Sequence, residues 1–168
     1  RQIGIRDRFR KVGANLLILG GTESKLDTAT QELRAIPGEG QVQYFVGDAG
    51  EEESVQRAVA LAANSGRLDI AIANAGPGSL APIEEIQDSE WQRVLQTNLS
   101  GPFYLVKSAA ASMSGGGALC ALSSIAGART HGCMGAYFTL KAALDWCVRN
   151  SPDELGENGR RWLRFGSR

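Results

Sequence analysis

Short apolar segments alternate with amphipathic segments along nearly the whole chain, and this alternation restricts the possible folds more than any other feature. The apolar runs have the length of buried strands, and the segments between them repeat their apolar residues at a helical period. The pattern predicts strands over 15–19, 42–46, 68–73 and 118–122, and helices over 5–12, 22–33, 51–64, 89–113 and 136–149. Strands that alternate with helices predict an α/β fold, a parallel sheet with helices on both faces.

Length and charge limit the class of protein. A chain of 168 residues suffices for one domain with its own core, so we expect residues 1–168 to form a single domain. The 18 basic residues balance the 18 acidic ones, which argues against a nucleic-acid or anionic-membrane partner. No apolar run approaches the roughly 20 residues of a membrane helix, and the N-terminal residues show no charged-then-apolar leader pattern. We expect a soluble protein whose partner is a small molecule or a second copy.

The three cysteines, Cys120, Cys133 and Cys147, have no metal-type spacing, and His131 is the sole histidine. An odd number of cysteines without such spacing is typical of reduced thiols in a cytoplasmic protein. We predict no metal site. A lone loop histidine is usually incidental, although His131 lies in the loop where a substrate contact would be possible.

Tyr137 and Lys141 give the strongest chemical signal, because residues four apart share one face of a helix. A neighbouring ammonium lowers the pKa of a phenol and makes it a better proton-transfer group near neutral pH. The alternative is a surface tyrosine beside a solvated lysine. Ser124 favours the functional interpretation, since its hydroxyl ends a predicted strand thirteen residues earlier and can bind the oxygen that the tyrosine protonates.

These residues resemble the motifs of the short-chain dehydrogenase/reductase family, and the resemblance extends over residues 9–158. The matching segments, in chain order, are Asp48, Asn74-Ala75-Gly76, the helix from Trp91 through Asn98 to Gly101, Leu122–Gly127, and Ala136-Tyr137 with Lys141-Ala142-Ala143. The resemblance implies a Rossmann-like, doubly wound parallel sheet, incomplete at both ends. It implies hydride transfer between a nicotinamide cofactor and an alcohol or ketone.

The resemblance also implies roles for individual residues. Tyr137 is the general acid in reduction and the general base in oxidation, and Ser124 positions the reacting oxygen. Lys141 assists the tyrosine and binds the nicotinamide ribose, and Asn98 holds a water that relays protons from Lys141. The structural alternative for Asn98 is a buried amide that satisfies helix carbonyls. Ser123 is the neighbour most easily confused with Ser124, and the family spacing to the tyrosine selects Ser124.

The resemblance implies cofactor binding at Asp48, which holds the adenine ring, and at Asn74, Ala75 and Gly76, which support the central sheet beside the cofactor. Asp48 can also be read as an ordinary turn residue at a strand end. Gly20 and Gly21 stand where an acidic residue binds the 2′-hydroxyl of NAD. Because neither is acidic, and because possible phosphate donors follow, NADP is preferred over NAD. These donors are Thr22, Ser24 and Lys25.

Both ends depart from the family pattern. The family's first strand and glycine-rich loop are expected before the first helix, and the sequence lacks them. The arginine-rich segment 160–168 replaces the expected strand and substrate-covering segment, so we expect a short strand there or none. A fragment, an altered reading frame, or a numbering that omits residues would each account for this.

Three functions follow in order of preference. The first is an active oxidoreductase, forming a homodimer or tetramer through the apolar helices that begin at Ser89 and Ala136. The second is a truncated binding or interaction protein that keeps the catalytic residues but cannot hold a dinucleotide. The third is an epimerase or dehydratase using the same tyrosine and lysine, which Asn98 and the Asn74–Gly76 segment disfavour.

Overall fold

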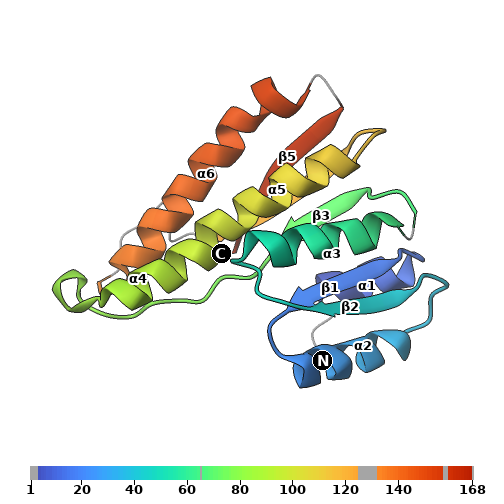
Figure 1. Ribbon diagram of the computed structural model, residues 1–168, viewed down its shortest axis with the longest axis horizontal. Coiled ribbons are helices and arrows are strands. Elements are labelled where there is room, and N and C mark those ends of the chain that lie inside the picture. Colours follow the sequence, from blue (N-terminus) through green and yellow to red (C-terminus); the bar gives the residue numbers. More distant parts are fainter. Residues whose placement is uncertain (1–3, 65, 125–131, 157–158, 168) are drawn as a thin grey trace. The chain divides into compact units, whose positions relative to one another are not determined.

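The computed structural model describes residues 4–64, 66–124, 132–156 and 159–167 (Figure 1). These residues form two compact units, one up to Ala49 and the other from Gly50 onward. Each unit is described separately below. Within the described part of the chain, no helix has both the length and the apolar character needed to cross a membrane.

The first unit is a parallel strand pair with two helices. Its elements are α1 (Ile5–Lys11), β1 (Leu16–Gly20), α2 (Glu23–Arg34) and β2 (Val42–Val46). The two strands pair in register from Leu16 with Val42 to Gly20 with Val46. Helix α2 buries Leu26, Thr30 and Leu33, residues spaced three or four apart and therefore on one face of the helix.

The second unit contains three parallel strands in the order β3-β4-β5. The strands are β3 (Ile70–Ala73), β4 (Gly117–Ser124) and β5 (Arg160–Ser167). Strand β4 is central, and side chains at alternate positions, Leu119, Ala121 and Ser123, are buried. In the ranges that the structure describes, no strand pairs with the second edge of β3, nor with the second edge of β1 in the first unit.

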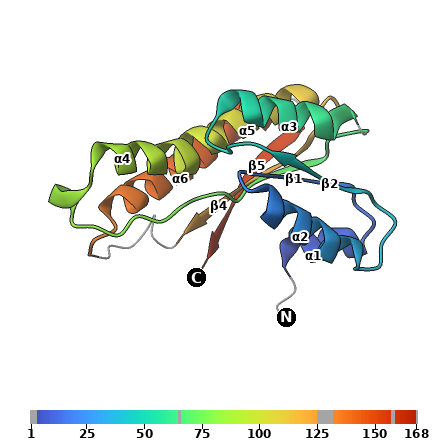
Figure 2. The ribbon, with the colours of Figure 1, turned by 60° about the horizontal axis from the view of Figure 1, so that its bottom comes forward.

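Helices flank this three-stranded sheet (Figure 2). They are α3 (Glu52–Asn64), the 3₁₀ turn η1 (Ile83–Glu85), α4 (Asp88–Leu95), the π-helical turn η2 (Gln96–Ser100), α5 (Gly101–Ser112) and α6 (Gly135–Leu155). A core cluster joins α6 to the sheet, and it consists of Ala121, Leu144 and Val148 with the partly buried Leu99 and Trp162 packed against them. Helix α6 is thereby fixed along β4 and β5.

The α/β fold with parallel strands flanked by helices is confirmed. The expectation of a short strand or none after residue 152 was wrong, because β5 runs for eight residues. It pairs with β4 from Gly117 with Arg160 to Ser124 with Ser167. Trp162 supplies the apolar contact to the core, while exposed Arg161 and Arg164 keep their charged heads near solvent.

Two helix predictions also needed correction. The helix expected over 89–113 is interrupted by η2, a π-helical turn centred on Asn98. The helix expected to end near Arg149 continues to Leu155 and contains Pro152. Pro152 removes one backbone donor from α6, and the Ser151 hydroxyl donates to the carbonyl of Val148 in the same turn.

Candidate active site

Lys141 lies at the centre of the candidate site. It is 4% exposed, and its Nζ donates a hydrogen bond of 2.8 Å to the carbonyl of Leu122 near the end of β4. The same Nζ lies 5.5 Å from the ring centroid of Tyr137, one helical turn earlier on α6. Burial lowers the pKa of the Lys141 ammonium, and the negative charge of Asp145 acts in the opposite direction. A buried positive charge therefore stands beside a phenol.

Ser124 and Tyr137 lie on either side of the loop that joins β4 to α6. Ser124 is the last residue of β4 and half-buried, whereas the neighbouring Ser123 is buried, with no hydrogen-bond partner for its hydroxyl among the described residues. Tyr137 is half-buried in the first turn of α6. Lys141 connects the two sides, because it contacts Tyr137 and binds the carbonyl two residues before Ser124.

The loop itself lies partly outside the described residues. Residues 125–131 are not described, and they include the Ile125–Gly127 part of the predicted motif and His131. After that range, Cys133 has a φ of 64° and its carbonyl accepts a 2.8 Å hydrogen bond from the Ala81 amide. The segment that precedes α6 is thus joined to the segment that follows β3.

Asn98 is fully buried and fixed by its side-chain amide. Its Nδ2 donates to the carbonyl of Pro77 at 3.0 Å and to the carbonyl of Val94 at 3.1 Å. The bond to Val94 satisfies a helix carbonyl, and the bond to Pro77 joins the π-helical turn to the segment after β3. Its Oδ1 is buried and has no hydrogen-bond partner among the described residues. The amide therefore retains one acceptor inside the site.

Asn74, Ala75 and Gly76 directly follow β3 and are exposed. Gly76 adjoins the other candidate residues. A Cβ added there would lie 2.5 Å from Asn98 Oδ1 and 3.5 Å from Lys141 Nζ. The space between backbone, amide and ammonium is thus too narrow for any larger side chain.

The remaining cofactor candidates belong to the first unit. Gly21 follows β1, Thr22 precedes α2 and Asp48 follows β2, and all three are exposed. A Cβ at Gly21 would meet nothing within 4 Å. These three residues belong to the first unit, whereas the residues around Lys141 belong to the second.

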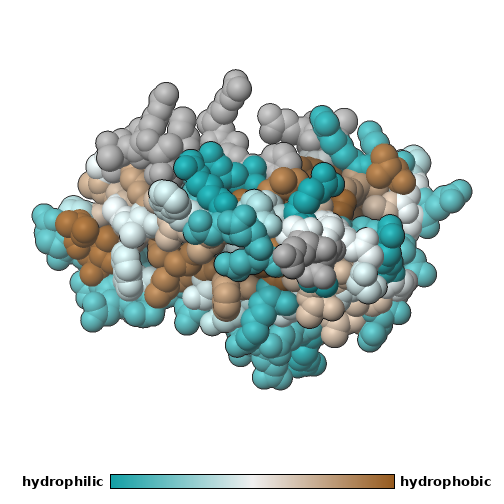
Figure 3. Space-filling view, turned by 90° about the horizontal axis from the view of Figure 1, so that it is seen from above, coloured by the Kyte–Doolittle hydropathy of each residue, from teal (hydrophilic) through white to brown (hydrophobic). Residues whose placement is uncertain are grey.

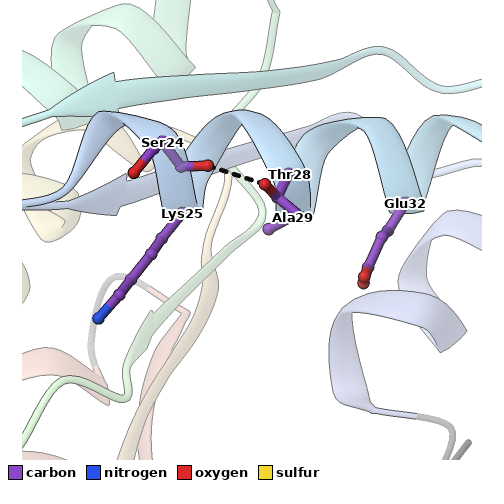
Figure 4. Close-up of a pocket in the computed structure, with 5 residues that line it drawn as sticks. All are labelled: Ser24, Lys25, Thr28, Ala29 and Glu32. Atoms are coloured by element: carbon purple, nitrogen blue, oxygen red, sulfur yellow. Dashed lines mark hydrogen bonds between the residues drawn. The ribbon is translucent and has the colours of Figure 1, made fainter.

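An open hollow lies along the exposed face of α2. Figure 4 shows its lining residues, Ser24, Lys25, Thr28, Ala29 and Glu32, and the hydrogen bond from the Thr28 hydroxyl to the Ser24 carbonyl. Two of the predicted phosphate donors, Ser24 and Lys25, are among them. The hollow therefore offers hydroxyl and ammonium groups together with one carboxylate.

An ion pair near Lys141 was not predicted from the sequence. Arg164 on β5 donates its Nη1 to Asp145 Oδ2 at 2.7 Å, and Asp145 lies four residues after Lys141 on α6. The four-residue spacing of Lys141 and Asp145 was a usable signal. The Arg164 partner was not accessible without β5.

A family model for short chain dehydrogenases matches residues 4–161. A reductase of Mycobacterium tuberculosis is 31% identical over 153 residues, which are 89% of this chain and 58% of that protein. Its name gives (5R,7aS)-5-hydroxy-7a-methyl-1-oxo-2,3,5,6,7,7a-hexahydro-1H-indene-carboxyl-CoA as its substrate. The chain therefore spans little more than half the length of this relative.

Solved structures give the same result. A short-chain dehydrogenase/reductase from Mycobacterium ulcerans superposes with a TM-score of 0.89 at 34% identity, over 96% of this chain and 61% of that one. A 7α-hydroxysteroid dehydrogenase, solved with NADH and 7-oxo glycochenodeoxycholic acid, gives 0.88 at 25% identity, over 96% and 64%. Each of these two likenesses covers 96% of this chain.

Proposed function

This chain belongs to the short-chain dehydrogenase family, and we propose that it carries the catalytic site of an oxidoreductase acting between NAD(P) and an alcohol or ketone. One observation carries the proposal. The buried Lys141 ammonium lies 5.5 Å from the Tyr137 ring and binds the carbonyl of Leu122, two residues before the Ser124 hydroxyl. In this proposal Tyr137 gives the proton, the Lys141 ammonium stabilises the phenolate that remains, and Ser124 supplies a hydroxyl at the end of β4.

The residues of the second unit fit the nicotinamide half of such a cofactor. Gly76 leaves open the space in front of Asn98 and Lys141 that a Cβ would fill. Lys141 can donate to ribose hydroxyls, and the exposed Gly76 lies next to its Nζ. When bound, the nicotinamide supplies or accepts the hydride.

Proton transfer falls to Tyr137 and Ser124. In reduction, the Tyr137 hydroxyl gives its proton to the carbonyl oxygen of the substrate, and the Ser124 hydroxyl donates a hydrogen bond to the same oxygen. In oxidation, Tyr137 takes the proton from the alcohol. The Lys141 charge stabilises the phenolate form of Tyr137, which remains after the proton is given up in reduction and which takes the proton in oxidation.

Asn98 completes the proton path in this proposal. Its Oδ1 is a buried acceptor with no described partner, and Lys141 Nζ lies on the other side of the same Gly76 space. A water bound at Oδ1 can exchange protons with the Lys141 ammonium and pass them to solvent. The two bonds from Nδ2 hold the amide in the orientation that this water requires.

For the adenosine half we propose Asp48, Gly21 and Thr22, with NADP preferred over NAD. The preference rests on Gly20 at the end of β1 and the exposed Gly21 after it, which present no carboxylate to a 2′-phosphate, and on Ser24 and Lys25 in the hollow on α2. NAD remains the second choice. Paired titrations with NADPH and NADH measure the preference directly.

We further propose a cytoplasmic homo-oligomer, a dimer or tetramer that acts on a small molecule. Phe103 on α5 is 55% exposed, and Trp146 on α6 is 63% exposed. Figure 3 shows apolar side chains, in brown, among the hydrophilic surface of one face of the molecule. Exposed aromatic residues on long helices favour self-association. The three free cysteines are typical of a reducing compartment. A monomer in multi-angle light scattering would remove the oligomer from this proposal.

Cofactor binding and turnover, measured separately, test the function. NADPH is titrated into the protein by fluorescence, and its oxidation with a panel of linear and cyclic ketones is followed by absorbance. Binding with turnover supports the oxidoreductase. Absence of binding by this chain supports the alternative, an interaction protein that retains catalytic side chains. Turnover without net cofactor oxidation, with an isomerised or dehydrated product, would indicate the epimerase or dehydratase.

A further inference from the structure

The Lys141 ammonium is a buried charge that needs electrostatic compensation. Lys141 is 4% exposed, and its Nζ donates a hydrogen bond to the neutral carbonyl of Leu122. Tyr137, 5.5 Å away, is a phenol. A carbonyl and an aromatic ring compensate only part of the cost of removing an ammonium from water. A nearby carboxylate would offset a further part of that cost.

Asp145 is placed to do so. It follows Lys141 by four residues on α6, so the two side chains lie on the same face of the helix. Side chains of a helix lean toward its N-terminus, which directs Asp145 toward the stem of Lys141. Asp145 is 7% exposed, and a carboxylate is rarely so buried unless a partner holds it. The charge of Asp145 raises the pKa of Lys141, against the effect of burial.

Arg164 fixes this carboxylate from the neighbouring strand. Its Nη1 binds Asp145 Oδ2 at 2.7 Å, while Oδ1 is buried and accepts no hydrogen bond from the described residues. The Arg164 side chain is 42% exposed, so its own charge is largely screened by water. The buried Asp145 charge is screened less and acts more strongly on Lys141 than the arginine does.

Other charged groups near Lys141 do not replace Asp145. On α4, which packs against α6, Glu90 and Arg93 form an exposed ion pair at 2.7 Å, so their charges offset each other. The π-helical turn contributes the neutral Asn98, and the end of β4 contributes Ser123 and Ser124. Among the described residues of these elements, the titratable and charged groups considered to face Lys141 are therefore Tyr137, Asp145 and Arg164.

We propose that Asp145 is a positioning residue for Lys141: anchored by Arg164 on β5, its carboxylate keeps the lysine charged and aligned with the end of β4. The proposal rests on the proposed function only in that Lys141 serves Tyr137. It adds a line of three groups, Arg164 to Asp145 to Lys141, running from β5 along α6 to the site. Asp145 itself touches neither substrate nor cofactor.

The titration of Lys141 tests this without any turnover. The chain has four lysines, so ¹³C labelling at the lysine ε-carbon gives few NMR signals, and Lys141→Arg identifies the signal of interest. Asp145→Asn keeps an oxygen for Arg164 and removes the charge. We expect the titration midpoint of Lys141 to fall by about one pH unit in Asp145→Asn. Asp153→Asn, at an exposed position of α6, is the matched control and should leave the midpoint unchanged.

A double variant separates this role from a merely structural ion pair. If Asp145 served only to neutralise Arg164, then Asp145→Asn with Arg164→Gln, which removes both charges, would restore the wild-type midpoint and overturn the proposal. We expect the midpoint to stay below wild type. If Asp145→Asn does not fold, the Lys141 midpoint of the double variant tests the proposal in its place. An unchanged midpoint in both variants refutes the positioning role.

The same samples keep this proposal distinct from the proposed function. A lowered midpoint in a protein that never oxidises NADPH would support the Asp145 role while contradicting the oxidoreductase. Normal turnover with an unchanged Lys141 midpoint would support the oxidoreductase and contradict the Asp145 role. In an active protein, the high-pH limit of kcat should move down with the Lys141 midpoint in Asp145→Asn.

Discussion

Asn98 and Gly76 share one narrow space, because a Cβ at Gly76 would lie 2.5 Å from Asn98 Oδ1. Asn98 cannot swing away without breaking its bonds to the carbonyls of Pro77 and Val94. The buried Asn98 amide can therefore occupy its position only because residue 76 has no side chain.

Gly76→Ala should lower the free energy of unfolding by about 1–3 kcal/mol, since the methyl group must displace a fixed amide or the backbone. Urea denaturation measures this. Gly78→Ala is the control, because a Cβ at Gly78 would meet nothing within 4 Å. Equal free energies of unfolding for Gly76→Ala and Gly78→Ala would show that the segment after β3 shifts at little energetic cost.

Asn98→Ala should lower the free energy of unfolding by about 1–3 kcal/mol, because two carbonyls lose their donor. Thr97→Ala is a matched control in the same turn, since the Thr97 hydroxyl makes an exposed bond to the Arg93 carbonyl. Its loss should cost less than about 0.5 kcal/mol. Similar losses in both variants would argue against a special role for the buried amide.

Tyr137→Phe should reduce kcat by roughly 10²- to 10⁴-fold, because it removes the proposed proton donor and leaves the ring in place. The dissociation constant for NADPH should remain nearly unchanged. Tyr104→Phe on α5 provides a control for the loss of a phenol elsewhere in the same unit. Turnover retained by Tyr137→Phe would contradict the assignment.

Lys141→Met should abolish turnover and yet raise the free energy of unfolding at neutral pH by about 1 kcal/mol, since it removes a buried charge and keeps most of the apolar stem. Denaturation of the variant and of the wild type at one pH measures the difference. A strongly destabilised Lys141→Met protein would mean that the ammonium is well compensated in the fold.

The pH dependence of that difference has a definite sign. Burial lowers the pKa of Lys141 in the folded state, so as pH rises through it the folded protein loses a proton that the unfolded chain still holds. The wild type should gain stability relative to Lys141→Met between the folded pKa and the ordinary lysine pKa. Over the same interval the catalytic rate should fall, because Tyr137 loses the charge beside it. A stability difference that does not change with pH would show that Lys141 titrates normally.

Much of the fold was predictable because local patterns and tertiary pairing agree. The run Val42–Val46 is apolar and bounded by turn residues, and β2 occupies the predicted residues. The segment 160–167 shows the opposite case. Its arginines give no strand pattern, and β5 exists because it pairs with β4 and buries Trp162. A local sequence pattern does not predict pairing between segments that are distant in the sequence.

The candidate site was likewise predictable only in part. The four-residue spacing of Tyr137 and Lys141 places them together on α6, and it can be read from the chain alone. The pairing of Asp145 with Arg164 depends on where β5 lies. The π-helical turn at Asn98 was also missed, because one wide turn hardly changes the apolar periodicity of the helices on either side.

That wide turn sets the rotation of everything that follows it. A π-helical turn holds about one residue more than an α-helical turn, and each residue of an α-helix turns the chain by about 100°. If residues 96–100 closed as a regular α-helix with all five residues kept, α5 would therefore rotate by nearly that angle relative to α4. Ala109 and Ala110, now buried, would swing out of the interior, so their burial depends on the wide form of this turn.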